Sequence, residues 1–204
     1  MGEPAAAGTG RLEAFSDGVL AVAITLLVLD LHADPDDPAG LAHQLAAEWP
    51  SFAAYVLSFF IIGVIWVNHH ALFTLAADAD RRLMFYNLLL LMWVTTIPFT
   101  TATLAGYLRA GGSDGRLAVL LYGASTEGMA ISFTLILRHL IRAGLLLRPV
   151  SAAEGRRAVR RFGVGSVLYP IVTAVGLLSP VLMLLLYAGM TAFYILEQTP
   201  GPTI

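Results

Sequence analysis

The 204-residue chain contains no cysteine and no lysine, and only 13% of its residues are charged. The absence of cysteine excludes disulfides, thiolate nucleophiles and cysteine metal sites. Soluble domains carry about 25% charged and about 45–50% apolar residues, whereas this chain is 57% apolar with a mean hydropathy of +0.75. One core of this size cannot hide such an excess. The composition excludes disorder, argues against a soluble globular enzyme and favours a membrane protein.

Six apolar stretches are long enough to cross a bilayer, which takes about 20 residues. They are Leu12–Leu31, Trp49–Leu75, Leu83–Leu104, Leu117–Leu137 and the two halves of Phe162–Leu196. We divide the last run at Ser179-Pro180, because proline ends or kinks a helix. The sequence predicts an all-α integral membrane protein with six transmembrane helices in residues 11–198. A disordered N-terminal tail (1–10) and a C-terminal tail (199–204) flank this domain.

The arginines predict the orientation of these spans. In a six-span topology, ten of the twelve basic residues fall on one side, and only Arg109 and Arg116 fall on the other. Because cytoplasmic loops are enriched in arginine, both termini are expected in the cytoplasm. The arginine-rich segment 138–161 is explained most simply as a topology determinant. The alternative explanation is that it binds the headgroups of anionic membrane lipids. No aromatic residues interleave with it, so nucleic acid is not expected.

The first span carries unusual polar residues. Asp17 lies near its start, and a carboxylate inside a membrane usually faces a bundle interior or water. At about 100° per residue, one narrow stripe of the helix holds four positions, namely Gly18, Val22, Thr25 and Leu29. Such a stripe is either a helix-packing seam or, when repeated by symmetry, the lining of a pore.

The segment Arg11-x-x-x-Phe15-Ser16-Asp17, followed by Ala-Val-Ala-Ile-Thr-Leu, closely resembles the signature of the endolysosomal potassium channel family. The resemblance is to bacterial members with one six-helix unit per chain, and it continues through Trp66-Val-Asn-His-His-Ala-Leu-Phe73. It implies a homotetramer in which the first helices line a central pore. It also implies passive, potassium-favouring conduction across the plasma membrane, no threonine-valine-glycine-tyrosine-glycine filter, no enzyme activity and no cofactor besides the permeating ion.

The resemblance also implies roles for residues of the first helix. Position by position, the hydrophobic constriction of the family falls on Val22, where isoleucine is common, so this constriction is formed by a smaller side chain. The threonine linked to selectivity falls on Thr25. Further aliphatic rings fall on Leu29 and on Leu26, which lies at the edge of the stripe.

The second span is expected to support the first through hydrogen bonds. Its polar residues are Trp66, Asn68, His69 and His70. A buried carboxylate needs donor partners, so we expect these side chains to form a network with Arg11, Ser16 and Asp17. Adjacent histidines on a helix point about 100° apart, which argues against a metal shared by the pair.

Two other functions remain open at this stage. A proton-coupled transporter would use Asp17 and Glu127, which lies in the middle of the fourth span, but the matched halves expected of many transporters are not evident. An intramembrane enzyme would use His69 and His70, but no facing nucleophile accompanies them.

Overall fold

A computed structural model describes residues 5–36, 38–108 and 112–196, and all regular structure within these ranges is helical. The elements in chain order are α1 (Ala5–Leu26), the 3₁₀ helix η1 (Leu27–Asp30), α2 (Leu41–Ala47), α3 (Trp49–Phe73), α4 (Arg81–Tyr107), α5 (Gly112–Arg142), α6 (Ala152–Gly163), α7 (Gly165–Gly176) and α8 (Pro180–Leu196).

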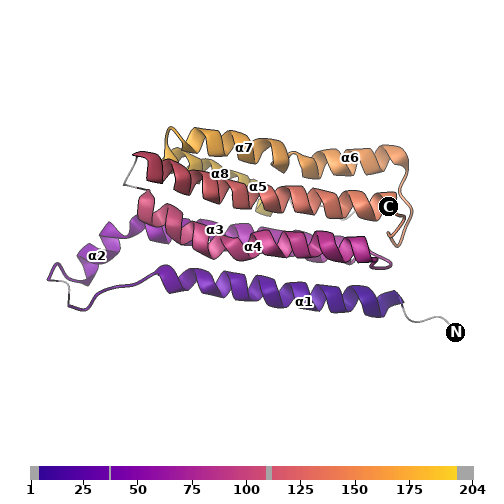
Figure 1. Cartoon of the computed structure of the whole chain (residues 1–204), viewed down its shortest axis with the longest axis horizontal. Coiled ribbons are helices and arrows are strands. Elements are labelled where there is room, and N and C mark those ends of the chain that lie inside the picture. The colour runs from indigo at the N-terminus through magenta and orange to yellow at the C-terminus, as the bar shows by residue number, and fades with distance from the viewer. Residues whose placement is uncertain (1–4, 37, 109–111, 197–204) are drawn as a thin grey trace.

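The long helices run side by side in an elongated bundle (Figure 1). α5 lies at the centre of the packing and contacts α4, α6 and α7, while α8 packs against α3 and α7. α1 lies along one side of the bundle, where it packs against α3 and α4. This position at the edge leaves one face of α1 without an intramolecular neighbour.

Four helical segments are long and apolar enough to cross a membrane: Thr9–Asp30, Trp49–Phe73, Arg81–Tyr107 and Gly112–Arg142. A fifth apolar segment, Pro180–Ile195, is shorter. The last apolar run is divided as expected, because α8 begins at Pro180. The run is also interrupted near its start, at Val164, which lies between the end of α6 and the beginning of α7.

Several boundaries differ from those expected. α1 begins at Ala5, so residues 5–10 are helical rather than a disordered tail, in keeping with the high helix propensity of its alanines. The segment between the expected third and fourth spans is partly helical, because α5 begins at Gly112 rather than at Leu117 and has Asp114 in its first turn, where an acidic group favours a helix. Residues 1–4, 109–111 and 197–204 lie outside the described residues.

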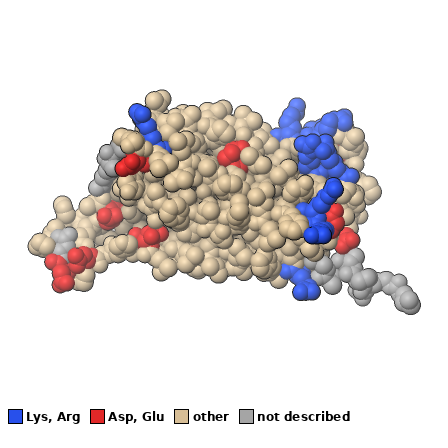
Figure 2. All heavy atoms as spheres, viewed as in Figure 1, with Lys and Arg blue, Asp and Glu red and all other residues tan. Residues whose placement is uncertain are grey.

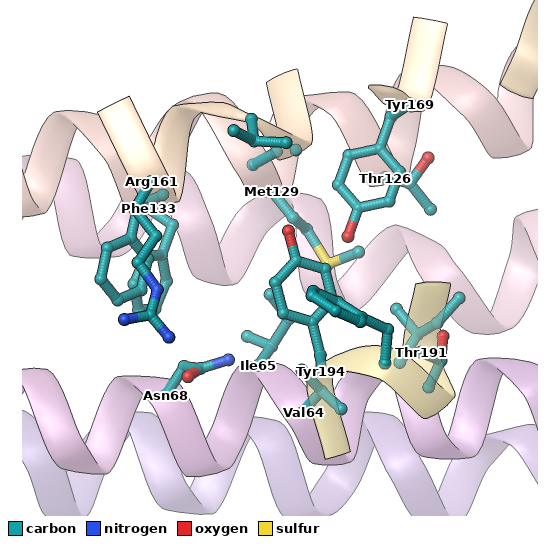
Figure 3. A pocket seen from close by; sticks show the side chains of 16 residues that line it. Val64, Ile65, Asn68, Thr126, Met129, Phe133, Arg161, Tyr169, Thr191 and Tyr194 are labelled. Carbon is teal, nitrogen blue, oxygen red and sulfur yellow. The ribbon is translucent and has the colours of Figure 1, made fainter. Parts of the chain in front are cut away.

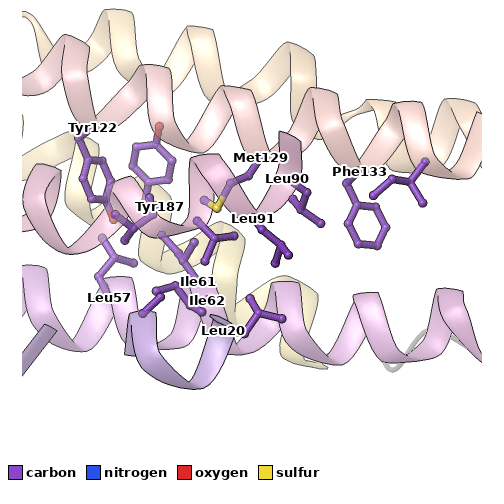
Figure 4. Packing of buried hydrophobic residues seen from close by; sticks show 14 of the residues in the cluster. Leu20, Leu57, Ile61, Ile62, Leu90, Leu91, Tyr122, Met129, Phe133 and Tyr187 are labelled. Atoms are coloured by element: carbon purple, nitrogen blue, oxygen red, sulfur yellow. The ribbon is translucent and has the colours of Figure 1, made fainter. Parts of the chain in front are cut away.

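The core is built from the facing sides of α1, α3, α4, α5 and α8 (Figure 4). Leu20, Ile62, Leu90 and Met129 are among its buried side chains. The core also holds hydroxyl groups, and these are paired with one another. Ser58 lies 2.8 Å from the Thr101 hydroxyl and 3.0 Å from the Tyr122 hydroxyl. Such pairing removes the cost of burying a polar group without a partner.

Charge is divided between the two ends of the bundle (Figure 2). Arginines gather at the end that holds α6, the start of α4 and the last turn of α5, while acidic residues predominate at the other end. At the arginine end two loops are joined, since the Ala77 amide donates to the Leu145 carbonyl at 2.8 Å and the Leu147 amide donates to the Leu75 carbonyl at 2.9 Å. A wide band with few charged residues separates the two ends (Figure 2), as expected for a protein that spans a bilayer.

An uncovered face on the first helix

α1 and η1 have two opposite faces with different surroundings. The face that packs into the bundle holds Ser16, Leu20, Ala23 and Leu27, all of them buried. Two residues after each of these buried positions, about 200° around the helix, lies an exposed one. These exposed residues are Gly18, Val22, Thr25 and Leu29. Val22 is 57% exposed, Leu26 43% and Leu29 69%. The stripe expected from the sequence is therefore the face of α1 that the rest of the chain does not cover.

Thr25 is the hydroxyl-bearing residue of this uncovered stripe. Its hydroxyl donates a hydrogen bond to the Val22 carbonyl at 2.9 Å. A hydroxyl has one hydrogen to donate and two lone pairs. Because the hydrogen is already used within the helix, the oxygen can act only as an acceptor toward the uncovered face. This is the arrangement that a metal cation requires of a hydroxyl.

Beneath the other face of α1, a hydrogen-bonded chain joins three helices. The Ser16 hydroxyl donates to the Leu12 carbonyl at 2.8 Å and accepts from the Asn87 amide of α4, also at 2.8 Å. The Asn87 carbonyl oxygen lies 2.8 Å from His69 Nε2 of α3. Since that oxygen can only accept, Nε2 carries the hydrogen. The His69 ring also stacks on Phe73, with 4.2 Å between centroids.

Two further contacts join α1 to α3 near the arginine end. The Trp66 indole N–H donates to the Asp17 carboxylate at 3.0 Å. His70 Nδ1 contacts the Glu13 carboxylate. Together with the Ser16 chain, these contacts hold the first half of α1 against the bundle and fix the rotation of α1 about its axis. That rotation decides which residues lie on the uncovered face.

The structure does not bring all of the expected residues into this network. Arg11 and Phe15 are exposed, and Arg11 forms no hydrogen bond or ion pair with any other described residue. The side chain of Asn68 lies on another face of α3, where it lines a cavity of about 290 Å³ between α3, α5, α7 and α8. Figure 3 shows Asn68 near Arg161 at one end of that cavity.

Two members of the network, Asn87 and Glu13, were not expected from the sequence. Asn87 lies alone among apolar residues of the third apolar stretch, in the segment Phe85-Tyr-Asn-Leu-Leu. A single amide in such a run is a signal that could have been noticed, since a polar side chain there requires a partner. Glu13 lies between Arg11 and Phe15 in the motif itself, at a position where the motif does not specify a residue.

The residues needed by the two other functions do not converge. Asp17 is bonded to Trp66 on the α1 side of α3, whereas Glu127 is on α5 and its buried Oε2 has no hydrogen-bond partner among the described residues. His69 and His70 contact different partners. Within the described part of the chain, no group of three or more histidine, aspartate or glutamate residues is arranged to hold a metal.

Comparison with known proteins extends these observations. Residues 11–98 match the family described as the endosomal/lysosomal potassium channel TMEM175. A protein of Streptomyces collinus named a potassium channel is 46% identical over 197 residues, which cover 96% of this chain and 95% of that protein. A potassium channel of Chamaesiphon minutus is 39% identical over 180 residues, covering 86% of this chain and 88% of the relative.

The fold is also that of a solved structure. The crystal structure of a lysosomal potassium-selective channel TMEM175 homologue from Chamaesiphon minutus matches with a TM-score of 0.82 at 35% identity. The match covers 94% of this chain and 98% of the other. The protein is thus a multi-pass membrane protein with a channel fold, and a transporter or enzyme is not favoured. This chain belongs to the TMEM175 channel family.

Proposed function

We propose that this protein is a potassium-favouring cation channel, in which four copies of the chain surround a central pore lined by α1. Each subunit contributes six spans, formed by α1, α3, α4, α5, the segment α6–α7 and α8. The channel lies in the plasma membrane with both termini in the cytoplasm, and it conducts passively without a cofactor. The observation that carries this proposal is the uncovered stripe on α1, which lies opposite its packed face.

An uncovered apolar stripe inside a membrane protein can face lipid or another copy of the chain. The stripe begins with a small residue, Gly18. The space beside it is open, because an added Cβ would meet nothing within 4 Å. Thr25 then places a hydroxyl between aliphatic residues. Homo-oligomers of closed symmetry repeat such a stripe around an axis. The relatives named as potassium channels favour the pore over a lipid-facing surface.

The chemistry of the stripe fits a gated cation path. Rings of Val22, Leu26 and Leu29 would constrict the pore with aliphatic groups, which close a narrow path by excluding water. A ring of Thr25 hydroxyl oxygens, each with its hydrogen donated to Val22, offers acceptors that replace part of the water shell of a cation. Selectivity is therefore assigned to Thr25 and the constriction to the three aliphatic residues.

The polar contacts of α1 support this assignment by fixing its register. Ser16, Asp17 and Glu13 hold one side of the helix to α3 and α4. A pore-lining helix held only by apolar contacts in lipid would rotate more easily, because lipid tails compete equally well for apolar surface. In this proposal the network positions the pore residues and has no contact with the ion.

The test is ion flux from proteoliposomes under a potassium or a sodium gradient. Native protein should pass potassium in preference to sodium without an imposed proton gradient. Thr25→Val keeps the size of the side chain and removes its oxygen, so it should lower the preference for potassium about tenfold, a difference of about 1.4 kcal/mol. Thr25→Ser retains the oxygen and serves as the matched control.

Two results would contradict the proposal. Unchanged selectivity in Thr25→Val would show that the filter is elsewhere. Flux that saturates and requires a proton gradient would identify a transporter. Native mass spectrometry of the detergent-solubilised protein should give the mass of four chains, and a monomeric mass with full flux would exclude a pore shared between subunits.

A further inference from the structure

The arginine end of the bundle contains an open basin that the conduction path does not use. It lies between the last turns of α5 and the exposed side of α6, and its volume is about 930 Å³. This volume falls in the range of about 300–1,000 Å³ that is typical of small-ligand sites. Five arginines line it: Arg138, Arg142, Arg156, Arg157 and Arg160.

The packing of two helices shapes this basin. Gly155 is the buried residue of α6, and a Cβ at this position would come within 3.0 Å of Ile141 Cγ2 of α5. The missing side chain lets the helices approach at that point. The arginine-bearing positions on either side of it then form the walls. The start of α6 is fixed by a capping box, in which Ser151 and Glu154 bond to each other's backbone amides.

Most of the positive charge of the basin is not balanced within the described part of the chain. Among the described residues, the five arginines form no ion pair and no hydrogen bond. Of the nearby carboxylates, Glu154 accepts from the Ser151 amide at 2.8 Å and offsets part of the charge of Arg157, while Asp80 contacts His139. The other four arginines of the basin have no such carboxylate beside them among the described residues. Five neighbouring guanidinium groups repel one another, so an anion bound between them would stabilise this end of the protein.

The surroundings of the basin identify the class of anion. Arg138 and Arg142 are in the last turns of the membrane-spanning helix α5, so the basin lies where the apolar band meets water. Its described lining also includes the apolar residues Ile141 and Val159, and it includes no aromatic residue on which a base could stack. A ligand with phosphate groups beside an apolar chain matches both features.

We propose that this basin binds the headgroup of an anionic phospholipid of the cytoplasmic leaflet, preferably one that carries two phosphates. Guanidinium groups bind phosphate oxygens in pairs, and basic pockets between membrane helices on this side bind such headgroups. Five arginines exceed what a single phosphate can engage. The acyl chains of the lipid would begin beside the apolar lining residues Ile141 and Val159.

The experiment uses the full-length protein in a nonionic detergent, with thermal unfolding and native mass spectrometry as readouts. The probes are cardiolipin, phosphatidylcholine and inorganic pyrophosphate, which carries two phosphates without acyl chains. Cardiolipin should raise the midpoint of unfolding and appear as a bound adduct. Phosphatidylcholine and pyrophosphate should do neither at the same concentration.

The variant Arg156→Gln/Arg160→Gln should bind cardiolipin at least about tenfold more weakly, because each arginine near an anionic surface adds to the attraction. The control Arg82→Gln/Arg148→Gln removes two charges from the same end of the bundle, outside the basin, and should bind as the native protein does. Both variants are measured first without lipid, and their own unfolding midpoints serve as the reference.

Three results would overturn the proposal. Equal stabilisation by pyrophosphate would assign the basin to a soluble anion rather than a lipid. Equal stabilisation by phosphatidylcholine would remove the role of the charged headgroup. An equal loss of cardiolipin binding in the two double variants would reduce the effect to the overall charge of this end of the protein.

Discussion

Asn87 is the residue on which the polar contacts between α1, α3 and α4 converge. Replacing it by leucine removes the donor to Ser16 and leaves the buried Nε2–H of His69 without an acceptor. An unpaired buried donor costs about 1–3 kcal/mol. Asn87→Leu should therefore lower the midpoint of thermal unfolding of the purified protein in detergent.

Asn68→Leu is the matched control for this change, because Asn68 is half-buried and forms no hydrogen bond with any other described residue. It should leave the midpoint nearly unchanged. If both variants lost equal stability, the hydrogen bonds of Asn87 would have no stabilising role. If Asn87→Leu also altered the preference for potassium, the network would be shown to act on the pore through α1.

Asp80 makes the stability of the protein depend on pH. The Leu83 amide donates to its carboxylate at 2.8 Å, and this bond together with the His139 contact holds the pKa of Asp80 below its usual value of 3.8. A lowered pKa in the folded state means that the stabilisation is complete above the unfolded pKa, near pH 4, and is lost as the pH falls through the folded pKa.

Asp80→Ala removes the helix cap and should cost about 1 kcal/mol at neutral pH. The difference in unfolding midpoint between the native protein and this variant should shrink as the pH falls below 4. Asp80→Asn is the control, since asparagine also caps helices but has no charge. It should be more stable than the alanine variant at pH 7. A difference between native protein and Asp80→Ala that stays constant down to pH 2.5 would contradict the titration of this group.

The sequence was informative about residues whose neighbours are on the same helix. That Gly18, Val22, Thr25 and Leu29 share one face of the helix followed from helical spacing alone, because one rotation fixes all four positions. That this face is exposed is shown by the structure. Their roles in conduction remain predictions. The partners of Asp17 and Ser16 required knowledge of which helices pack together, and spacing within one helix does not contain it. Asn68 was therefore expected in this network, whereas its side chain lines the cavity between α3 and α5.

At the scale of helices, the close approach of α4 and α5 depends on Gly128. A Cβ at Gly128 would lie 2.2 Å from the ring of Trp93, so Gly128→Ala forces that ring or the helices to move. Such overpacking costs about 1–3 kcal/mol, and the unfolding midpoint should fall. Gly63→Ala in α3 is the control, because nothing lies within 4 Å of the added carbon. A similar loss in both variants would refute the steric explanation.

The boundaries of the helices were partly readable from the sequence. Pro180 begins α8, as expected, whereas the capping box of Ser151 and Glu154 that begins α6 was not predicted. The break at Val164 between α6 and α7 has no proline and no cap of this kind. It separates the arginine-bearing part of the segment from the apolar part, and it lies between Gly163 and Gly165. Glycine has a low helix propensity, so the pair favours a break here, but a glycine inside a helical pattern does not by itself fix where a helix ends.

At the scale of the whole molecule, the arginine end and the acidic end define an orientation across the membrane (Figure 2). The charge division was expected from the sequence because it depends only on the order of loops. The proposed pore was not obtainable in the same way, since it would be formed by several copies of one helix. A single chain shows only that α1 has a face with nothing covering it.

The absence of cysteine makes this orientation directly measurable. Asp36→Cys places a single thiol in the exposed loop before α2, and Val150→Cys places one in the exposed loop before α6, at the arginine end. Because cytoplasmic loops are enriched in arginine, a membrane-impermeant maleimide should label the first variant in intact spheroplasts. It should label the second only after the membrane is permeabilised. The reverse pattern would invert the proposed orientation and would place the arginine basin against the outer leaflet. Labelling of both variants in intact spheroplasts would mean that the two loops lie on the same side, which six spans do not allow.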